Sequence, residues 1–302
     1  MLFLLDSSQS LESAELKGVL FALVSAFCWA VGSSVYKKGL ESTDPWSGNL
    51  IRTGCATGGF LVIMAIHNTL SQSLNVTVSL LFWLIFSSFF AFFLGDLLFL
   101  VSLKRIGVSR TVPISSTYPL FVTVWAFLVY RRPVSIFIVL GTLLIVVAIK
   151  LISEEKRSEN DNGNHIRSKG IFFALLAAVC WSISLAVLDH LLLYLDTEVV
   201  AGIRFLITFL LTAAVVSTRG FTYNRNALIW IGISGTTLLV FSNYIFLEAI
   251  KITSSSRAAP VSAVYPVISV FLAAIFLKEK LTLRIIAGTL LSFLGVFFVV
   301  IG

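Results

Sequence analysis

Four charged side chains interrupt long apolar stretches of the sequence: Arg52, Asp96, Arg204 and Glu248. A charge in an apolar segment is costly, so such residues usually pair with one another or serve a function. Arg52 and Asp96 lie at similar depths from the same end of their segments, and we expect them to form an ion pair. Asp96 is then a candidate for coupling, either by titrating or by holding Arg52 in a state-dependent pair.

Arg204 takes the place of Arg52 in a second copy of the same pattern, but Asn243 takes the place of Asp96. The positive charge of Arg204 is therefore less completely neutralised. A carboxylate or phosphate of a substrate could bind it through a bidentate contact that lysine would not reproduce. The structural alternative is a permanent pair between Arg204 and Glu248.

Two matching segments, SRTVPISSTYP and SRAAPVSAVYP, each place a tyrosine directly before a proline. A phenol offers stacking area and one hydrogen bond, which suits small amphipathic solutes, so we expect a cavity lined by such residues. The candidate cavity residues are Tyr118, Tyr265, Arg204, Asn243, Trp29, Trp181, Ser115 and Ser262. The prolines predict hinges or kinks, because each removes a helical donor: Pro113, Pro119, Pro260 and Pro266. The hydroxyl groups could instead bond back to their own helices.

The sequence shows none of the spacings that mark catalysis or metal binding: no P-loop, no zinc-binding histidine pair and no nucleophile elbow. We therefore expect no enzyme activity, no catalytic residue, no metal and no cofactor. Cys28, Cys55 and Cys180 fall in apolar segments and are interpreted as small core residues. The net charge of +7 is spread over short loops, so nucleic acid is not an expected partner.

The elements that must position these residues are membrane-spanning helices. Of the 302 residues 58% are apolar and 12% charged, far from the composition of a soluble domain. Long, nearly uncharged runs predict an all-α membrane protein, because helices satisfy the backbone in lipid. We count ten spans: 18–36, 47–66, 79–101, 112–130, 133–152, 170–189, 197–217, 227–249, 259–277 and 282–301. Lys and Arg concentrate in the odd-numbered loops, which predicts that these loops are cytoplasmic and both termini are outside.

The chain repeats itself. KGVLFALVSAFCWA at 17–30 returns as KGIFFALLAAVCWS at 169–182, and GTLL occurs at 141–144 and at 288–291. Five spans per copy is an odd number, so the second copy is expected to be inverted relative to the first. The predicted organisation is a tail at 1–16, a first repeat at 17–152, a polar linker at 153–169 and a second repeat at 170–302.

Small residues recur at seven-residue spacing in the last span of each copy, namely Gly141, Ala148, Gly288 and Gly295. They predict closely packed helices. The seam could lie within one chain or join two chains as a homodimer.

Several segments resemble the EamA family of the drug/metabolite transporter superfamily: WAVGSSVYKK, DLLFLVSLKRIGVSRTVPISSTYPLF and NYIFLEAIKITSSSRAAPVSAVYPVISVFLAAIFLKEKLTLRIIAGTLL. The resemblance covers nearly everything after residue 16. It implies a ten-helix secondary carrier with a central cavity that moves small metabolites, often outward. The family commonly has a Gly-Glu pair between the fourth and fifth spans. Glu279 resembles that glutamate in the second copy, whereas Arg132 stands there in the first.

Inverted repeats allow a midplane cavity to open alternately to either side, so we expect a multi-pass transporter of the plasma membrane, in contact with lipid and a small-molecule substrate. An exporter of amino acids or similar amphipathic solutes is the leading hypothesis. The alternative substrate is a phosphorylated or nucleotide-linked sugar, since basic residues could bind phosphate. Channels and non-transporting receptors or scaffolds are the remaining classes.

Overall fold

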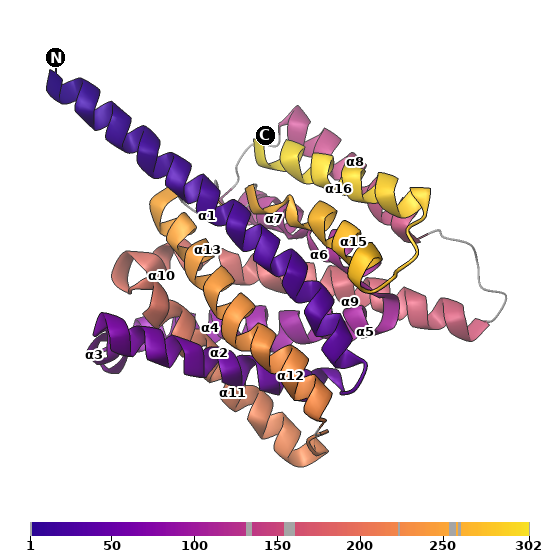
Figure 1. The fold of residues 1–302 in the computed structure, drawn as a ribbon. Helices are drawn as coiled ribbons and strands as arrows, with labels where there is room; N and C mark the ends of the chain where they lie inside the picture. The colour runs from indigo at the N-terminus through magenta and orange to yellow at the C-terminus, as the bar shows by residue number, and fades with distance from the viewer. Residues whose placement is uncertain are drawn as a thin grey trace.

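The computed structural model describes residues 2–130, 135–153, 161–222, 224–253, 258 and 261–301, and within them the chain forms only helices and connecting turns (Figure 1). The N-terminal half contains α1 (Leu2–Leu40), α2 (Pro45–His67), α3 (Leu70–Leu74), α4 (Val78–Ser88), the π-helix η1 (Phe89–Gly95), α5 (Asp96–Ile106), α6 (Val108–Ser115), α7 (Tyr118–Tyr130) and α8 (Ile136–Ser153). The C-terminal half contains α9 (Asp161–Leu185), α10 (Leu188–Tyr194), α11 (Thr197–Arg219), α12 (Arg225–Ser234), the π-helix η2 (Gly235–Leu239), α13 (Val240–Thr253), α15 (Tyr265–Phe276) and α16 (Leu283–Ile301).

Six helical segments of the described chain are long and apolar enough to cross a bilayer: Ala14–Leu40, Pro45–His67, Val78–Ile106, Ile166–Tyr194, Thr197–Arg219 and Arg225–Thr253. Shorter apolar helices cover Ile136–Ile152, Tyr265–Phe276 and Leu283–Val299. Large apolar side chains are exposed on their outer faces, which suits a lipid environment and not water. The chain is therefore an all-helical, multi-pass membrane protein.

Helices extend across two of the predicted boundaries. Residues 2–16, expected to be a separate tail, continue α1 as helix. The segment expected to be a polar linker already contains the start of α9 at Asp161. Polar residues can extend a helix beyond the bilayer, because water then satisfies their side chains, so hydropathy marks the apolar span rather than the helix end.

The ends of α2 follow local sequence signals. The side chain of Asp44 accepts hydrogen bonds from the backbone N–H groups of Trp46 at 2.8 Å and Ser47 at 3.2 Å, so it caps the helix start. Burial by itself would raise the pKa of Asp44, but hydrogen bonds from Ser47, Thr222 and Trp46 favour the carboxylate and hold this pKa below its ordinary value. The helix stops at Asn68, whose φ of 58° is left-handed.

The two halves interlock rather than forming separate bodies. α8 packs along α16 and α2 along α11, which are corresponding helices of the two copies (Figure 1). α1 packs on α12, α13 and α15 of the second half, while α9 packs on η1, α5, α6 and α7 of the first. Every one of these contacts joins one copy to the other, so the core between them is shared.

The small-residue seam lies between α8 and α16. A Cβ atom at Gly141 would lie 2.5 Å from the carbonyl oxygen of Gly295, and one at Gly288 would lie 3.0 Å from that of Ala148. Side chains at these glycines would collide with the partner backbone, so glycine permits the close approach. Within this chain, the seam joins the last span of one copy to the last span of the other.

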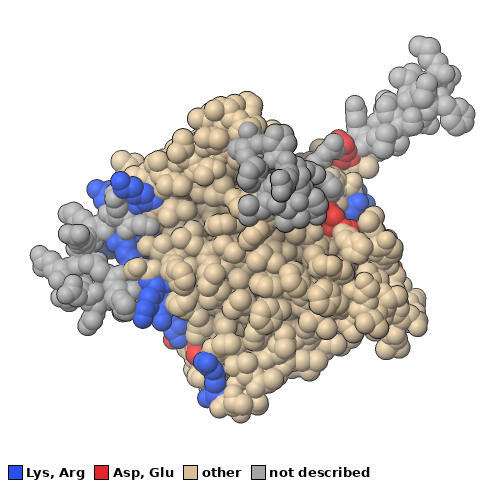
Figure 2. Space-filling view, turned by 180° about the vertical axis from the view of Figure 1, so that it is seen from behind, with Lys and Arg blue, Asp and Glu red and all other residues tan. Residues whose placement is uncertain are grey.

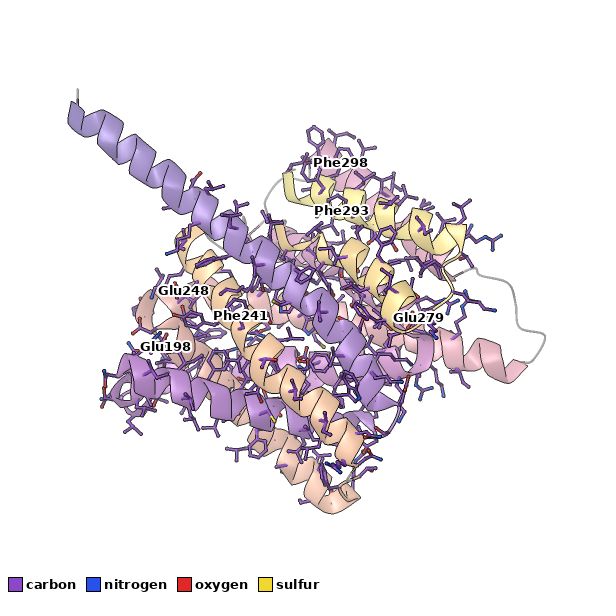
Figure 3. All side chains as sticks on the ribbon, in the orientation of Figure 1. Glu198, Phe241, Glu248, Glu279, Phe293 and Phe298 are labelled. Atoms are coloured by element: carbon purple, nitrogen blue, oxygen red, sulfur yellow. The ribbon has the colours of Figure 1, made fainter. Side chains whose placement is uncertain are left out.

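One end of the bundle gathers basic residues. Lys104 Nζ donates to the backbone carbonyl of Thr43 at 2.6 Å, and Thr43 Oγ1 donates to the backbone carbonyl of Thr222 at 3.1 Å. The chain segments around these three residues therefore meet at this end of the bundle. We call this the basic end, and Figure 2 shows Lys and Arg gathered along that edge. In Figure 3, Glu198 and Glu248 lie at the other end of the bundle from Glu279.

Candidate functional site

A cavity of about 170 Å³ lies between the two halves. Apolar and aromatic side chains make up most of its wall, and seven polar side chains reach it: Ser33, Arg52, Asp96, Ser184, Arg204, Ser242 and Asn243. A concave, mostly apolar site with a few convergent polar groups is the usual form of a small-molecule site. This cavity is therefore the candidate functional site.

Trp181 of the second half stands between two aromatic residues of the first half on the cavity wall. Its ring centre lies 5.3 Å from that of Phe99, and 6.4 Å from that of Tyr118 in an edge-to-face arrangement. Such aromatic pairs stabilise by roughly 0.5–1.5 kcal/mol beyond the area they bury. Residues from α5, α7 and α9 are thereby joined in one cluster.

The corresponding cluster exists with the halves exchanged. Trp29 of the first half lies 4.7 Å from Phe246 and 6.0 Å from Tyr265 of the second half, both edge-to-face. The four predicted aromatic residues, Trp29, Trp181, Tyr118 and Tyr265, all line the cavity. The duplication thus supplies two similar aromatic clusters, each built from both halves.

The tyrosines begin new helices after matched breaks in the chain. A turn at 116–117 separates α6 from Tyr118, and a turn at 263–264 precedes Tyr265. Pro119 and Pro266 come next, in the first turn of α7 and α15, where a missing N–H group costs no helical hydrogen bond. They follow directly on the breaks, at the starts of α7 and α15.

Pro113 alone among the described candidates lies inside a helix, α6, just before the break. The hydroxyls of Ser116 and Thr117 donate to the carbonyls of Val112 at 2.6 Å and Ile114 at 2.7 Å, so these side chains bond back to their own helix at the break. Pro260, the fourth proline, lies outside the residues that the structure describes.

Ser115 and Ser262 do not line the cavity, contrary to expectation. Both are fully buried behind the tyrosines. The Ser262 hydroxyl lies 3.4 Å from that of Tyr118, and Ser115 is a hydroxyl neighbour of Tyr265. Each serine therefore lies near the tyrosine of the other half.

Arg52 and Asp96 form the expected ion pair, and both side chains are almost fully buried at the cavity. Trp181 Nε1 donates to the other carboxylate oxygen of Asp96 at 2.9 Å. The Arg52 guanidinium carbon lies 5.1 Å from the centre of the Tyr36 ring. The carboxylate therefore connects a charged residue of its own half to an aromatic residue of the other.

Arg204 is held quite differently. Its Nη2 donates to Ser184 Oγ at 3.0 Å, and its guanidinium carbon lies 4.6 Å from the centre of the Phe92 ring. No ion pair links it to any residue that the structure describes. Glu248 instead accepts a hydrogen bond of 2.5 Å from Thr197 and does not line the cavity. The structure therefore does not form the alternative Arg204–Glu248 pair, and Glu248 lies outside the cavity wall.

Both copies contain a π-helix next to the site, which the sequence did not indicate. η1 ends directly before Asp96, and η2 ends shortly before Asn243, whose side-chain amide donates to the carbonyl of Leu239 at 2.9 Å. π-helical turns frequently occur at functional sites. No residue pattern in the sequence predicts these π-helices. Their corresponding positions in the two copies show that they belong to the repeated structure.

Comparison with known proteins identifies the family. A model of the EamA-like transporter family matches residues 16–154 and again residues 168–301. The chain belongs to the EamA-like transporter family. Because the model matches once in each half, it confirms the internal duplication of this EamA chain.

The relatives of this EamA chain point to transport. It is 30% identical to an uncharacterized transporter of Archaeoglobus fulgidus, covering 92% of this chain and 96% of that protein. It is 26% identical to the uncharacterized transporter YcbK of Bacillus subtilis, covering 70% and 69%, and 21% identical to the protein LicB of Haemophilus influenzae, covering 93% and 96%. A solved crystal structure shares the fold, with a TM-score of 0.62 at 15% identity over 95% and 96% of the two chains.

Proposed function

We propose that this EamA-family membrane transporter is a secondary carrier that works by alternating access, with its substrate in the central cavity. The observation that supports this most is the pair of matched aromatic clusters around Trp29 and Trp181, each built from both halves. Two similar halves that share one binding site can exchange conformations, so that the site opens to either side in turn. A channel or a static scaffold has no need of that arrangement.

The proposed architecture has ten spans in two inverted sets of five. Beyond the six membrane-length helices, the remaining four spans would be α6 with α7, α8, α15 and α16. If each span crosses the membrane once, all odd-numbered loops lie on one side, and the hydrogen bonds among such loops at the basic end support this alternation. The basic end would face the cytoplasm by the positive-inside rule.

The proposed substrate is a small amphipathic metabolite, an amino acid before others, moved outward. A cavity of about 170 Å³ suits a solute of that size, since an apolar cavity of ~150 Å³ holds one benzene ring. The second candidate, a phosphorylated sugar, draws support from Arg204, which could bind phosphate. A nucleotide-linked sugar fits this volume poorly, because sites for drug-sized ligands usually measure ~300–1,000 Å³.

Counterflow in liposomes containing the purified protein tests the proposal. We expect uptake of a labelled amino acid that saturates and that accelerates when unlabelled amino acid is loaded on the other side. Trp181→Ala should lower this flux, whereas Phe27→Ala, whose side chain is exposed on the outer face of α1, should not. Flux that never saturates would indicate a channel, and binding without flux would indicate a receptor or scaffold.

A further inference from the structure

We infer that the cavity recognises its ligand through a single carboxylate group held by Arg204, while an apolar part of the ligand packs against the aromatic wall. This inference rests on the proposed function, because it names the substrate class of the same cavity. It draws on three properties of the site: its balance of charges, the geometry around Arg204 and the chemistry of the remaining wall.

The charges on the cavity wall do not cancel. Three of the residues that line it carry full charges: Arg52, Asp96 and Arg204. Arg52 and Asp96 neutralise each other in their ion pair. Arg204 is 3% exposed and forms no ion pair with a described residue, so the wall keeps one positive charge. A buried guanidinium without an anion is costly, and a bound anion would remove that cost.

The guanidinium of Arg204 is fixed in position and has hydrogen-bonding capacity to spare. Phe92 packs against its face and Ser184 accepts from one terminal nitrogen, so two contacts define the plane of the group. Its Nε is buried without a hydrogen-bond partner among the described residues. A planar guanidinium presents paired N–H groups at its edge, and a carboxylate binds them bidentately.

The rest of the wall determines what the carboxylate can be attached to. Trp29, Phe246, Leu185 and Leu188 line the cavity, and such surfaces favour an apolar body. A ligand with a single positive charge would meet the uncompensated charge of Arg204 without attraction. A doubly charged phosphate would leave one negative charge in excess. The geometry points to a monocarboxylate with an apolar body, with or without an ammonium group.

Binding of matched probes to the purified wild-type protein tests this without any substitution. Three probes share one phenyl ring: 3-phenylpropionate, phenethylamine and phenyl phosphate. We expect 3-phenylpropionate to bind at least tenfold more tightly than phenethylamine and more tightly than phenyl phosphate, as measured by quenching of tryptophan fluorescence. Equal or tighter binding of phenethylamine would overturn the inference, and so would tighter binding of phenyl phosphate.

Substitutions then locate the group responsible. Arg204→Gln should lower the affinity for 3-phenylpropionate at least tenfold. The matched control is the double variant Arg52→Gln/Asp96→Asn, which removes the other cavity arginine together with its counter-charge. Because Arg204 remains, this variant should keep the preference for the carboxylate over the amine. A preference lost in the double variant and kept in Arg204→Gln would overturn the inference.

Arg204→Lys keeps the inference testable where Arg204→Gln does not fold, as judged by its melting temperature. Lysine retains the charge but not the paired donors, so binding should weaken while the preference for the carboxylate remains. Wild-type affinity in Arg204→Lys would contradict bidentate recognition. Arg204-dependent binding without flux in liposomes would refute the proposed carrier and leave the inference intact. Amino-acid flux together with an unchanged affinity of Arg204→Gln for 3-phenylpropionate would refute the inference and leave the proposed carrier intact.

Discussion

Arg52 and Arg204 show how one residue difference alters two matched environments. Arg52 pairs with Asp96, whereas the residue corresponding to Asp96 is Asn243, whose amide donates to a backbone carbonyl of η2. An amide carries no charge to offset a guanidinium, so Arg204 relies on Ser184 and on the face of Phe92. A single Asp-to-Asn difference thus converts a neutral site into a positively charged one.

At this scale we predict that Asp96→Asn lowers both stability and transport, because it leaves Arg52 buried without a counter-charge. Breaking a buried pair from one side costs about 3–5 kcal/mol, whereas removing both charges is often tolerated. The double variant Arg52→Gln/Asp96→Asn should therefore recover the melting temperature. If Asp96 also couples transport to protons, the double variant should still lack the pH dependence of wild-type flux.

Glu248→Gln is the matched control, since Glu248 lies in the apolar part of the sequence but outside the cavity. A glutamine can still accept the hydrogen bond from Thr197, so both the melting temperature and the pH dependence of flux should stay near wild type. Asp96 would be a purely structural residue if the double variant transported with unchanged rate and pH dependence. Flux and melting are measured on the same preparations.

At the scale of elements, α8 and α16 pack closely against each other. The two helices approach because glycines on each face the backbone of the other, which leaves no room for side chains. The last span of each half is therefore fixed to its counterpart, away from the cavity, and this contact serves to hold the halves together.

We predict that Gly295→Leu destabilises the protein, because a Cβ atom there would already lie 2.8 Å from the carbonyl oxygen of Gly141. Overpacking of this kind costs about 1–3 kcal/mol. Gly58→Ala, inside α2, is the control: its Cβ atom would meet nothing within 4 Å, so it should leave the melting temperature unchanged or slightly higher. A wild-type melting temperature for Gly295→Leu would show that the seam is not closely packed.

A second element-scale contact involves Glu279, in the turn between α15 and α16. Its carboxylate accepts from the backbone N–H groups of Val108 and Ser109, both at 2.9 Å, and from the Ser109 hydroxyl at 2.5 Å. It therefore caps the start of α6 from the other half of the protein. The preceding Gly107 has a φ of 80°, which lets the chain turn there without strain.

We predict that Glu279→Ala loosens the start of α6 at a cost of about 0.5–2 kcal/mol, the usual range for a lost helix cap. Hydrogen–deuterium exchange of peptides spanning residues 107–112 should become faster. Glu41→Ala is the control, because Glu41 forms an exposed pair with Lys38 that contributes little. Unchanged exchange at the start of α6 in Glu279→Ala would contradict a capping role.

At the scale of the whole molecule, the charges separate along the bundle. The basic end carries the loops joined through Thr43 and Lys104, whereas Glu198 at the opposite end accepts hydrogen bonds from Thr69 at 3.1 Å and contacts His67 at 3.0 Å. Figures 2 and 3 show the two ends. Such asymmetry orients a protein in the membrane, because Lys- and Arg-rich loops stay in the cytoplasm.

We predict that a reporter active only in the cytoplasm is inactive when fused after Gly302 and active when fused after a truncation at Gly220, which follows α11 at the basic end. The expected pattern follows from the Lys and Arg bias of the odd-numbered loops. The opposite pattern would mean that the basic end faces outward. A fusion after His67, at the end of α2 away from the basic end, is the internal control and should be inactive.

Several features of this protein were determined by the sequence itself. Long apolar runs indicate a lipid environment. In lipid the backbone must satisfy its own hydrogen bonds, so these runs also predict helices. The duplication is visible in identical residues such as Trp29 and Trp181, and the Arg52–Asp96 contact followed from depth alone. These properties depend on composition, spacing and repetition along the chain, which need no knowledge of how helices pack.

Tertiary structure decided what depends on helix rotation and neighbours. Whether Ser115 faces the cavity, whether Glu248 reaches Arg204 and whether Gly295 meets another helix of the same chain are all set by angles between helices. A span of apolar residues has no polar face to reveal its rotation, because lipid and protein interior are equally apolar. The sequence likewise did not show that each tyrosine meets the tryptophan of the other copy, because that contact depends on how the two halves pack.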